Sequence, residues 1–130
     1  MIVVPDTNVL VAALVANGLC TEVVLHGIRQ RSLVSSDLLL AELDRTLRRK
    51  FKVTPAVARF LELLHSDIRL VEPIALPVSV CRDPDDDVVL GTAVAAAADL
   101  IITGDQDLLV LRTYERIEIV TPRQYLERFA

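Results

Sequence analysis

The stretch Met1-Ile2-Val3-Val4-Pro5-Asp6 opens the chain with a continuous apolar run that stops at a proline and an acid. A short run without polar alternation predicts a parallel strand that is buried on both faces. Asp6-Thr7-Asn8 then supplies three side chains that favour a helix N-terminus, and a helix is expected to reach about Asn17-Gly18. A buried strand that leads directly into a helix is the unit of parallel α/β sheets.

The same alternation of strands and helices continues along the chain. Further strands are expected at residues 33–35, 68–71, 100–103 and 117–120. Helices are expected at about 21–30, 37–49, 54–64 and 85–98, after residue 107, and from residue 121 onward. The sequence therefore predicts a single α/β domain, residues 1–130, with three layers (α/β/α) around a central parallel sheet of four to five strands.

The bulk properties restrict the class of protein. A chain of 130 residues, 52% of them hydrophobic, can form a core without a disulfide or a structural metal. The net charge of −4 argues against a protein that holds nucleic acid by overall charge. Cys20 and Cys81 lack C-x-x-C spacing, which favours free thiols in a reducing cytoplasm. The apolar run at residues 9–16 is too short to span a bilayer and follows no Lys or Arg, so we expect a cytoplasmic protein without a membrane segment.

Four separated acids are the candidate site. Asp6 and Asp105 each follow a predicted strand, and ligands of open parallel sheets gather where the strands end. Asp86 lies in the first turn of an alanine-rich helix, and Glu42 lies inside the helix after the second strand. Singly, each has a structural explanation as a helix cap, a turn residue, a solvated side chain or a partner of the helix dipole. Together, they predict a shared cation site.

The chemistry of such a site follows from its ligands. Carboxylates brought together repel one another unless protons or a cation neutralise them. Oxygen ligands alone suit Mg²⁺ or Mn²⁺ rather than zinc. A divalent ion that contacts phosphate oxygens and polarises water serves phosphoryl chemistry, so the acids indicate phosphodiester hydrolysis.

Four motifs in this order carry a resemblance to a known family. They are Val4-Pro5-Asp6-Thr7-Asn8, Leu40-Ala41-Glu42-Leu43, Arg82-Asp83-Pro84-Asp85-Asp86-Asp87 with Val88-Val89-Leu90 after it, and Ile102-Thr103-Gly104-Asp105-Gln106-Asp107-Leu108-Leu109. With them the chain resembles the PIN domains over essentially its whole length. Within that family it looks most like the VapC-like toxin subunits of prokaryotic toxin–antitoxin pairs.

The resemblance implies a Mg²⁺- or Mn²⁺-dependent endoribonuclease. The residues that match its catalytic, metal-holding acids are Asp6, Glu42, Asp86 and Asp105. The residues that match its supporting positions are Asn8 and Thr103, beside the first and fourth acids, and the further acid Asp107. Counting back from Thr92-Ala93 favours Asp86 as the third acid, and a shift of one residue would put Asp87 there instead.

The expected partners are RNA, a small antitoxin whose segment blocks the acidic groove, and a second copy of the chain in a homodimer. Arg45, Arg48 and Arg49 near the end of the Glu42 helix could contact RNA phosphates, or they could be a solvated, dipole-complementing helix end. The alternative to an enzyme is a catalytically silent PIN-like module that binds RNA or a partner without cutting.

Overall fold

The computed structural model describes residues 1–130 and contains a central, mainly parallel sheet. Its strands are β1 (Val3–Pro5), β4 (Leu100–Ile102), β6 (Ile117–Val120) and β5 (Thr113–Tyr114), in the order β1-β4-β6-β5. The first three run parallel, and β5 pairs antiparallel with β6. Strands β2 (Val34–Ser35) and β3 (Arg69–Leu70) form a parallel pair. A parallel bridge between Val3 and Leu33 places that pair beside β1.

Seven helices accompany the strands. They are α1 (Thr7–Val15), α2 (Leu19–Arg29), α3 (Asp37–Lys50), α4 (Pro55–Asp67), α5 (Pro84–Ala95), α6 (Gln106–Leu109) and α7 (Pro122–Phe129). Several begin at the side-chain caps that the sequence indicates: Ser36 and Thr54 each accept a backbone N–H of the first turn. The predicted α/β architecture with a central parallel sheet is confirmed.

Two details differ from the prediction. Helix α5 ends at Ala95 rather than near Ala98, because Ala97 adopts a positive φ of 51° and the Ala98 N–H turns back to the Ala93 carbonyl at 2.9 Å. Strand β5 was not expected, because two half-polar residues give no apolar run. It adds an antiparallel edge to a sheet that the sequence predicts as parallel.

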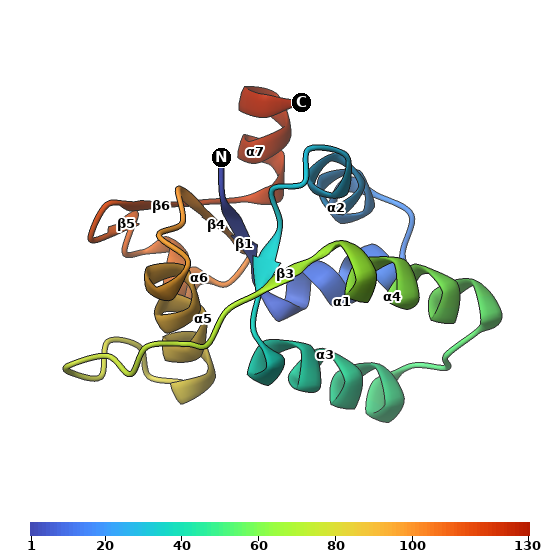
Figure 1. Cartoon of the computed structure of the whole chain (residues 1–130), viewed down its shortest axis with the longest axis horizontal. Helices are drawn as coiled ribbons and strands as arrows, with labels where there is room; N and C mark the ends of the chain where they lie inside the picture. Colours follow the sequence, from blue (N-terminus) through green and yellow to red (C-terminus); the bar gives the residue numbers. More distant parts are fainter.

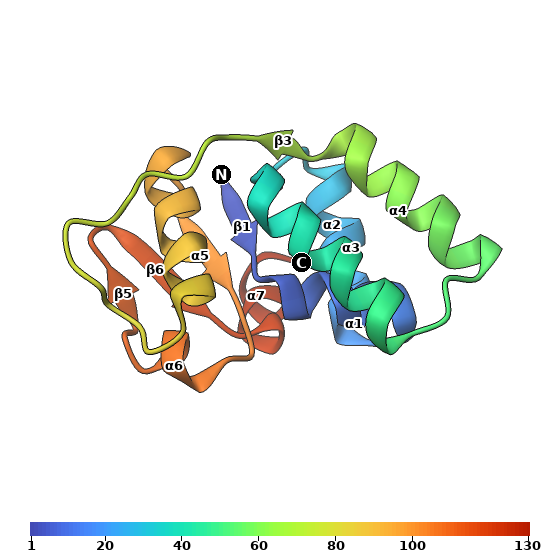
Figure 2. The same cartoon turned by 90° about the horizontal axis from the view of Figure 1, so that it is seen from below.

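Alternate residues of each central strand face opposite layers. Val3, Leu100 and Ile102 belong to a core shared with α1–α4 and α7, whereas Val4 and Ile101 belong to a core shared with α5 and α6. Figures 1 and 2 show these two groups of helices on opposite sides of β1. Helices therefore cover both faces of the sheet, which gives the three layers predicted.

No single helix is long and apolar enough to cross a bilayer; α1 and α2 reach that length only as a pair bent by 106°.

A segment without regular structure, which we call the strap (residues 71–81), connects β3 towards α5 and lies against that helix. The Ile74 N–H donates to the Gly91 carbonyl at 3.1 Å, and a Cβ at Gly91 would overlap the Ile74 carbonyl oxygen. One turn earlier, the Asp87 carboxylate accepts the N–H groups of Val80 and Cys81 at 3.2 and 2.8 Å. Residues 87 and 91 share one face of α5, so this face fixes the strap.

Candidate active site

Asp6 and Asp105 meet at the carboxyl ends of β1 and β4. The buried Thr103 hydroxyl joins them: it donates to Asp6 Oδ2 at 2.7 Å and accepts the Asp105 N–H at 2.9 Å. Burial raises the pKa of Asp6 and the Asp105 charge adds to this, while the Thr103 hydrogen bond acts in the opposite direction. Asp6 occupies the N-cap position of α1, yet its side chain makes no cap hydrogen bond. Its carboxylate serves the sheet edge instead of the helix.

The tightest group of carboxylates consists of Asp86, Asp105 and Asp107. One oxygen of each lies within 4.8 Å of the others. Asp105 caps the short helix α6 by accepting the Asp107 N–H at 2.9 Å, which sets these two side chains side by side. Asp86 reaches them from the first turn of α5.

Asp86 is the most strongly perturbed acid at this edge. Its side chain is almost fully enclosed, with 7% of the residue exposed. Burial, followed by the charges of Asp105 and Asp6, raises its pKa to about 7. Its Oδ2 atom is buried without any hydrogen-bond partner. An enclosed carboxylate oxygen that lacks a donor and faces other carboxylates is an arrangement that a cation would satisfy.

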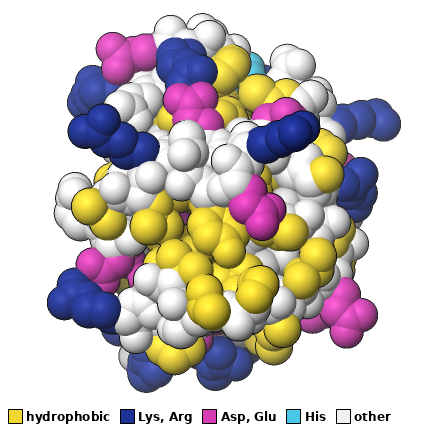
Figure 3. All heavy atoms as spheres, turned by 90° about the vertical axis from the view of Figure 1, so that its left-hand side faces the viewer, with side chains coloured by type: hydrophobic (Ala, Val, Ile, Leu, Met, Phe, Trp, Pro, Cys, Tyr) yellow, Lys and Arg dark blue, Asp and Glu magenta, His cyan; other side chains and the backbone are white.

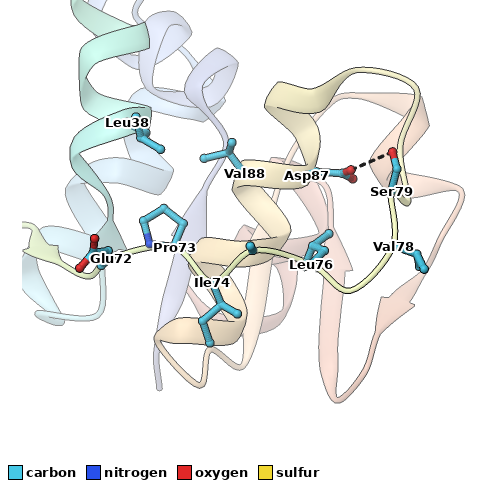
Figure 4. Close-up of a pocket in the computed structure, with 10 residues that line it drawn as sticks. Leu38, Glu72, Pro73, Ile74, Leu76, Val78, Ser79, Asp87 and Val88 are labelled. Carbon is cyan, nitrogen blue, oxygen red and sulfur yellow. Dashed lines mark hydrogen bonds between the residues drawn. The ribbon is translucent and has the colours of Figure 1, made fainter.

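Asp87, the neighbour of Asp86, is turned towards the strap. Its Oδ1 accepts the Cys81 N–H, and its Oδ2 accepts both the Val80 N–H and, at 3.3 Å, the Ser79 hydroxyl, the last of which Figure 4 shows. Burial acts to raise its pKa, but these hydrogen bonds outweigh it and the pKa is lowered. Both oxygens of Asp87 are therefore used within the fold, whereas Asp86 has a free one.

Glu42 approaches the same edge from α3. It lies outside the three-carboxylate group, but burial raises its pKa, and the charges of Asp85 and Asp6 raise it further. Asp85 and Asp83 thus extend the acidic surface beyond the acids selected from the sequence. Asn8 is exposed in the first turn of α1, and its expected supporting role at the first acid stays a prediction.

The basic residues considered for RNA contacts lie on α3, and a further one, Arg82, lies in the loop before α5. Arg45, Arg48 and Arg49 are exposed on α3. The charge of Arg45 acts to lower the pKa of Glu42, which burial and the nearby acids raise. Arg48 pairs with Asp44 at 3.9 Å. Arg82 lies closest to the carboxylate group, since its Nη2 donates to Asp107 Oδ1 at 2.8 Å. Sequence reasoning assigned Arg82 no role, because a pair between residues 25 positions apart leaves no local signal.

The two cysteines are free thiols, as expected. Cys81 is buried at the end of the strap, where burial and the charge of Asp87 raise its pKa to about 12. A thiol with such a pKa is not a nucleophile at neutral pH. The groups at this edge that could bind a cation or take part in a reaction are therefore its carboxylates and hydroxyls, not a thiol.

An apolar groove of about 490 Å³ lies between α3, α5 and the strap. Leu38 of α3, Val88 of α5 and Pro73 of the strap point into it in Figure 4. Ile74 and Val78 of the strap are about half exposed or more, and Figure 3 shows hydrophobic side chains gathered over part of that face. The groove shares helices with two of the acids: Leu38 lies one turn before Glu42 on α3, and Val88 lies on α5 two residues after Asp86.

Comparison with known families agrees with this site and fold. Several carboxylates at the carboxyl ends of parallel strands in an α/β domain are compatible with a site for a divalent cation. The family model for the PIN domain matches residues 2–107, so the chain belongs to the PIN-domain family. PIN domains are in general nucleases that use divalent metal, and the three-carboxylate group fits that class. No curated protein and no solved structure gave a significant match.

Proposed function

We propose that this chain is a Mg²⁺- or Mn²⁺-dependent endoribonuclease whose acids are Asp6, Glu42, Asp86 and Asp105, with Asp107 beside them. The observation that carries the proposal is the Asp86 carboxylate. It is enclosed, one of its oxygens has no partner, and it lies in a group with Asp105 and Asp107 that is at most 4.8 Å across. No lysine or arginine donates to Asp86, so its neutralisation is left to a proton or a bound cation.

The residues would divide the work as follows. Asp86, Asp105 and Asp107 would hold a divalent ion, with Asp6 kept in place by the Thr103 hydroxyl. Such an ion, when bound, polarises a water molecule and the phosphate oxygens. Glu42 lies outside the tight group and has a raised pKa, which suits its carboxylate to accept a proton from water. Asp87 is excluded as a ligand in this proposal, because both its oxygens hold the strap.

The ligand chemistry supports the choice of metal. The group contains carboxylate oxygen only, and Cys81 keeps its proton at neutral pH. Oxygen donors of this kind are typical of Mg²⁺ and Mn²⁺ sites. We therefore expect cleavage in either ion and its loss in a chelator.

The toxin role is a further part of the proposal. The four motifs resemble VapC-like toxins, and we propose a cytoplasmic homodimer that a small antitoxin silences. The apolar groove between α3, α5 and the strap offers a surface for an antitoxin segment. Co-expression with the product of a small adjoining gene is expected to suppress RNA cleavage. Cleavage that no such partner suppresses would leave a nuclease without a toxin role.

Replacement of the best-fixed acid tests the nuclease activity. Asp6→Asn keeps the size of the side chain and an acceptor for the Thr103 hydroxyl but removes the charge. We expect metal-dependent cleavage of total RNA to fall to background while the thermal unfolding transition is retained. Asp67→Asn, at the end of α4 just before β3, is the matched control and should cleave as the wild type does.

The alternative function predicts a different pattern. A catalytically silent module would bind RNA, and neither wild type nor Asp6→Asn would show cleavage above a chelator blank. Equal metal-dependent cleavage by Asp6→Asn and wild type, in preparations free of contaminating nuclease, would show that the assigned acids are not the site.

A further inference from the structure

Arg82 is the only basic residue with a hydrogen bond to the acidic group. It lies in the loop just before α5, and its Nη2 donates to Asp107 Oδ1 at 2.8 Å. The Arg82 side chain is 86% exposed, and no other hydrogen bond holds it. A guanidinium carries five N–H donors in a rigid plane, so about four of them remain free beside the carboxylates.

The Arg82–Asp107 pair has little to do for the fold. Exposed ion pairs contribute about 0–1 kcal/mol to stability. The backbone at Asp107 is also fixed without Arg82, because the Asp107 N–H donates to Asp105 Oδ1 at 2.9 Å in the cap of α6. A side chain that is tethered by one donor and presents the others to solvent is arranged for a ligand with several acceptor oxygens.

We propose that Arg82 binds a phosphate of the RNA strand next to the one that is cut. This inference rests on the proposed ribonuclease function and adds a substrate contact to it. A phosphate offers the oxygens that an arginine fork matches. In a chain of net charge −4 with clustered acids, a cation at this position offsets the repulsion of the RNA backbone.

The position of Arg82 also indicates the path that an RNA strand would follow across the site. Arg82 adjoins Asp107 at the α6 end of the acids, whereas Arg45 acts on Glu42 at the α3 end. A strand whose cut phosphate lies at Asp86 and Asp105 therefore passes a cation at each end of the acidic group. The chemistry recognised is the phosphodiester backbone, so this contact carries no base preference.

RNA binding in a background that does not cleave tests the proposal directly. The Asp6→Asn protein and its Arg82→Ala, Arg82→Lys and Arg116→Ala derivatives would be titrated against a fluorescent single-stranded RNA in Mn²⁺ at several salt concentrations. Arg116 is exposed just before the N-terminal end of β6, whereas the acids lie at the carboxyl ends of the parallel strands. It is therefore the charge-matched control. We expect Arg82→Ala to weaken binding about tenfold and to lower the salt slope by about 0.7, the value for one phosphate contact on a single strand.

The other variants separate a substrate contact from a structural role. Arg82→Lys should recover part of the affinity, since it keeps the charge but not the fork. With Asp6 intact, Arg82→Ala should raise KM more than it lowers kcat, and the half-saturating Mn²⁺ concentration should not rise, because the change frees Asp107 Oδ1. A weaker response to Mn²⁺ with unchanged RNA affinity would mean that Arg82 only positions Asp107, and would overturn the proposal.

The outcomes for Arg82 and for the nuclease are distinguishable. Equal RNA affinity and salt slope for Arg82→Ala and Arg116→Ala would overturn the Arg82 contact while leaving the loss of cleavage in Asp6→Asn intact. Absence of RNA binding by the parent protein would also overturn it. Undiminished cleavage by Asp6→Asn would instead reject the acids as the catalytic site, whatever Arg82 does.

Discussion

Two adjacent carboxylates of α5 face two different regions of the molecule: Asp86 faces the acidic edge of the sheet, and Asp87 faces the strap. Their surroundings are opposite in kind. Asp86 faces other acids, has a partnerless buried oxygen and a pKa raised to about 7. Asp87 accepts three hydrogen bonds and has a lowered pKa. Successive helix positions are rotated by about 100°, so one turn of helix can serve two surfaces with different requirements.

The difference shows that Asp87 and the strap stabilise the folded protein, whereas Asp86 and the acidic edge destabilise it when no cation is bound. A carboxylate with several N–H and O–H donors is stabilised in its charged form, as Asp87 is. A buried carboxylate among like charges destabilises the metal-free protein, as Asp86 does. The acidic edge is therefore the part of the molecule that a bound cation would stabilise most, and the strap is a part that needs none.

The largest expected effect separates the two neighbours by activity. Asp86→Asn should reduce metal-dependent RNA cleavage by about 100-fold or more, since it removes a charged oxygen at the proposed metal. Asp87→Asn should stay within a few-fold of wild type, because the hydrogen bonds of its side chain all go to the strap. Initial rates at saturating Mn²⁺ measure both. The reverse order of effects would exchange the roles of the two acids.

The second effect is on stability and follows from the raised pKa of Asp86. Its folded pKa of about 7 exceeds the ordinary value of 3.8, so the folded protein holds this proton more tightly than the unfolded chain. The resulting stabilisation is complete below about pH 4 and is lost as the pH rises through about 7. We expect the free energy of unfolding in a chelator to fall by roughly 2–4 kcal/mol over that range.

Urea unfolding at about pH 5 and about pH 8 measures this loss. Asp86→Asn should remove much of the difference between the two pH values, and Mn²⁺ should restore stability to the wild type at the higher pH. Equal pH dependence for wild type and Asp86→Asn would contradict the assigned cause. Burial also raises the pKa of Asp6 and Glu42, so some dependence should remain in the variant.

How far the sequence predicts this molecule differs between the sheet and its edges. Continuous apolar runs placed β1 and β4 correctly, because a strand that is buried on both faces needs such a run. The prediction of β6 also held, although Glu118 interrupts its apolar residues. Strand β5 and the early end of α5 escaped prediction. The first depends on pairing at a sheet edge, and the second on a positive φ at Ala97, which no residue type there signals.

The sequence predicted which strand-end acids would meet, but not the inner arrangement of the acidic group. Strand ends indicated that Asp6 and Asp105 would meet, and the structure joins them through Thr103. The sequence left two neighbours open as the third acid, because the choice depends on the rotation of α5 against the strap. The part of Arg82 and the close grouping of Asp107 with Asp86 are contacts between distant segments, which spacing alone does not reveal.

The smallest expected effect concerns the strap itself. Gly91→Ala should lower the free energy of unfolding by about 1–2 kcal/mol, because the new Cβ would push against the Ile74 carbonyl oxygen, a backbone atom that cannot rotate away. This loss would occur although alanine favours helices by roughly 1 kcal/mol over glycine. Gly18→Ala, where a Cβ meets open space, is the control and should change stability by less than about 1 kcal/mol.

Cleavage at saturating Mn²⁺ should be kept in both variants, since residue 91 shares its helix face with Asp87 rather than with Asp86. A Gly91→Ala protein that unfolds like wild type but cleaves poorly would show that the strap and the acidic edge are coupled through α5 rather than independent.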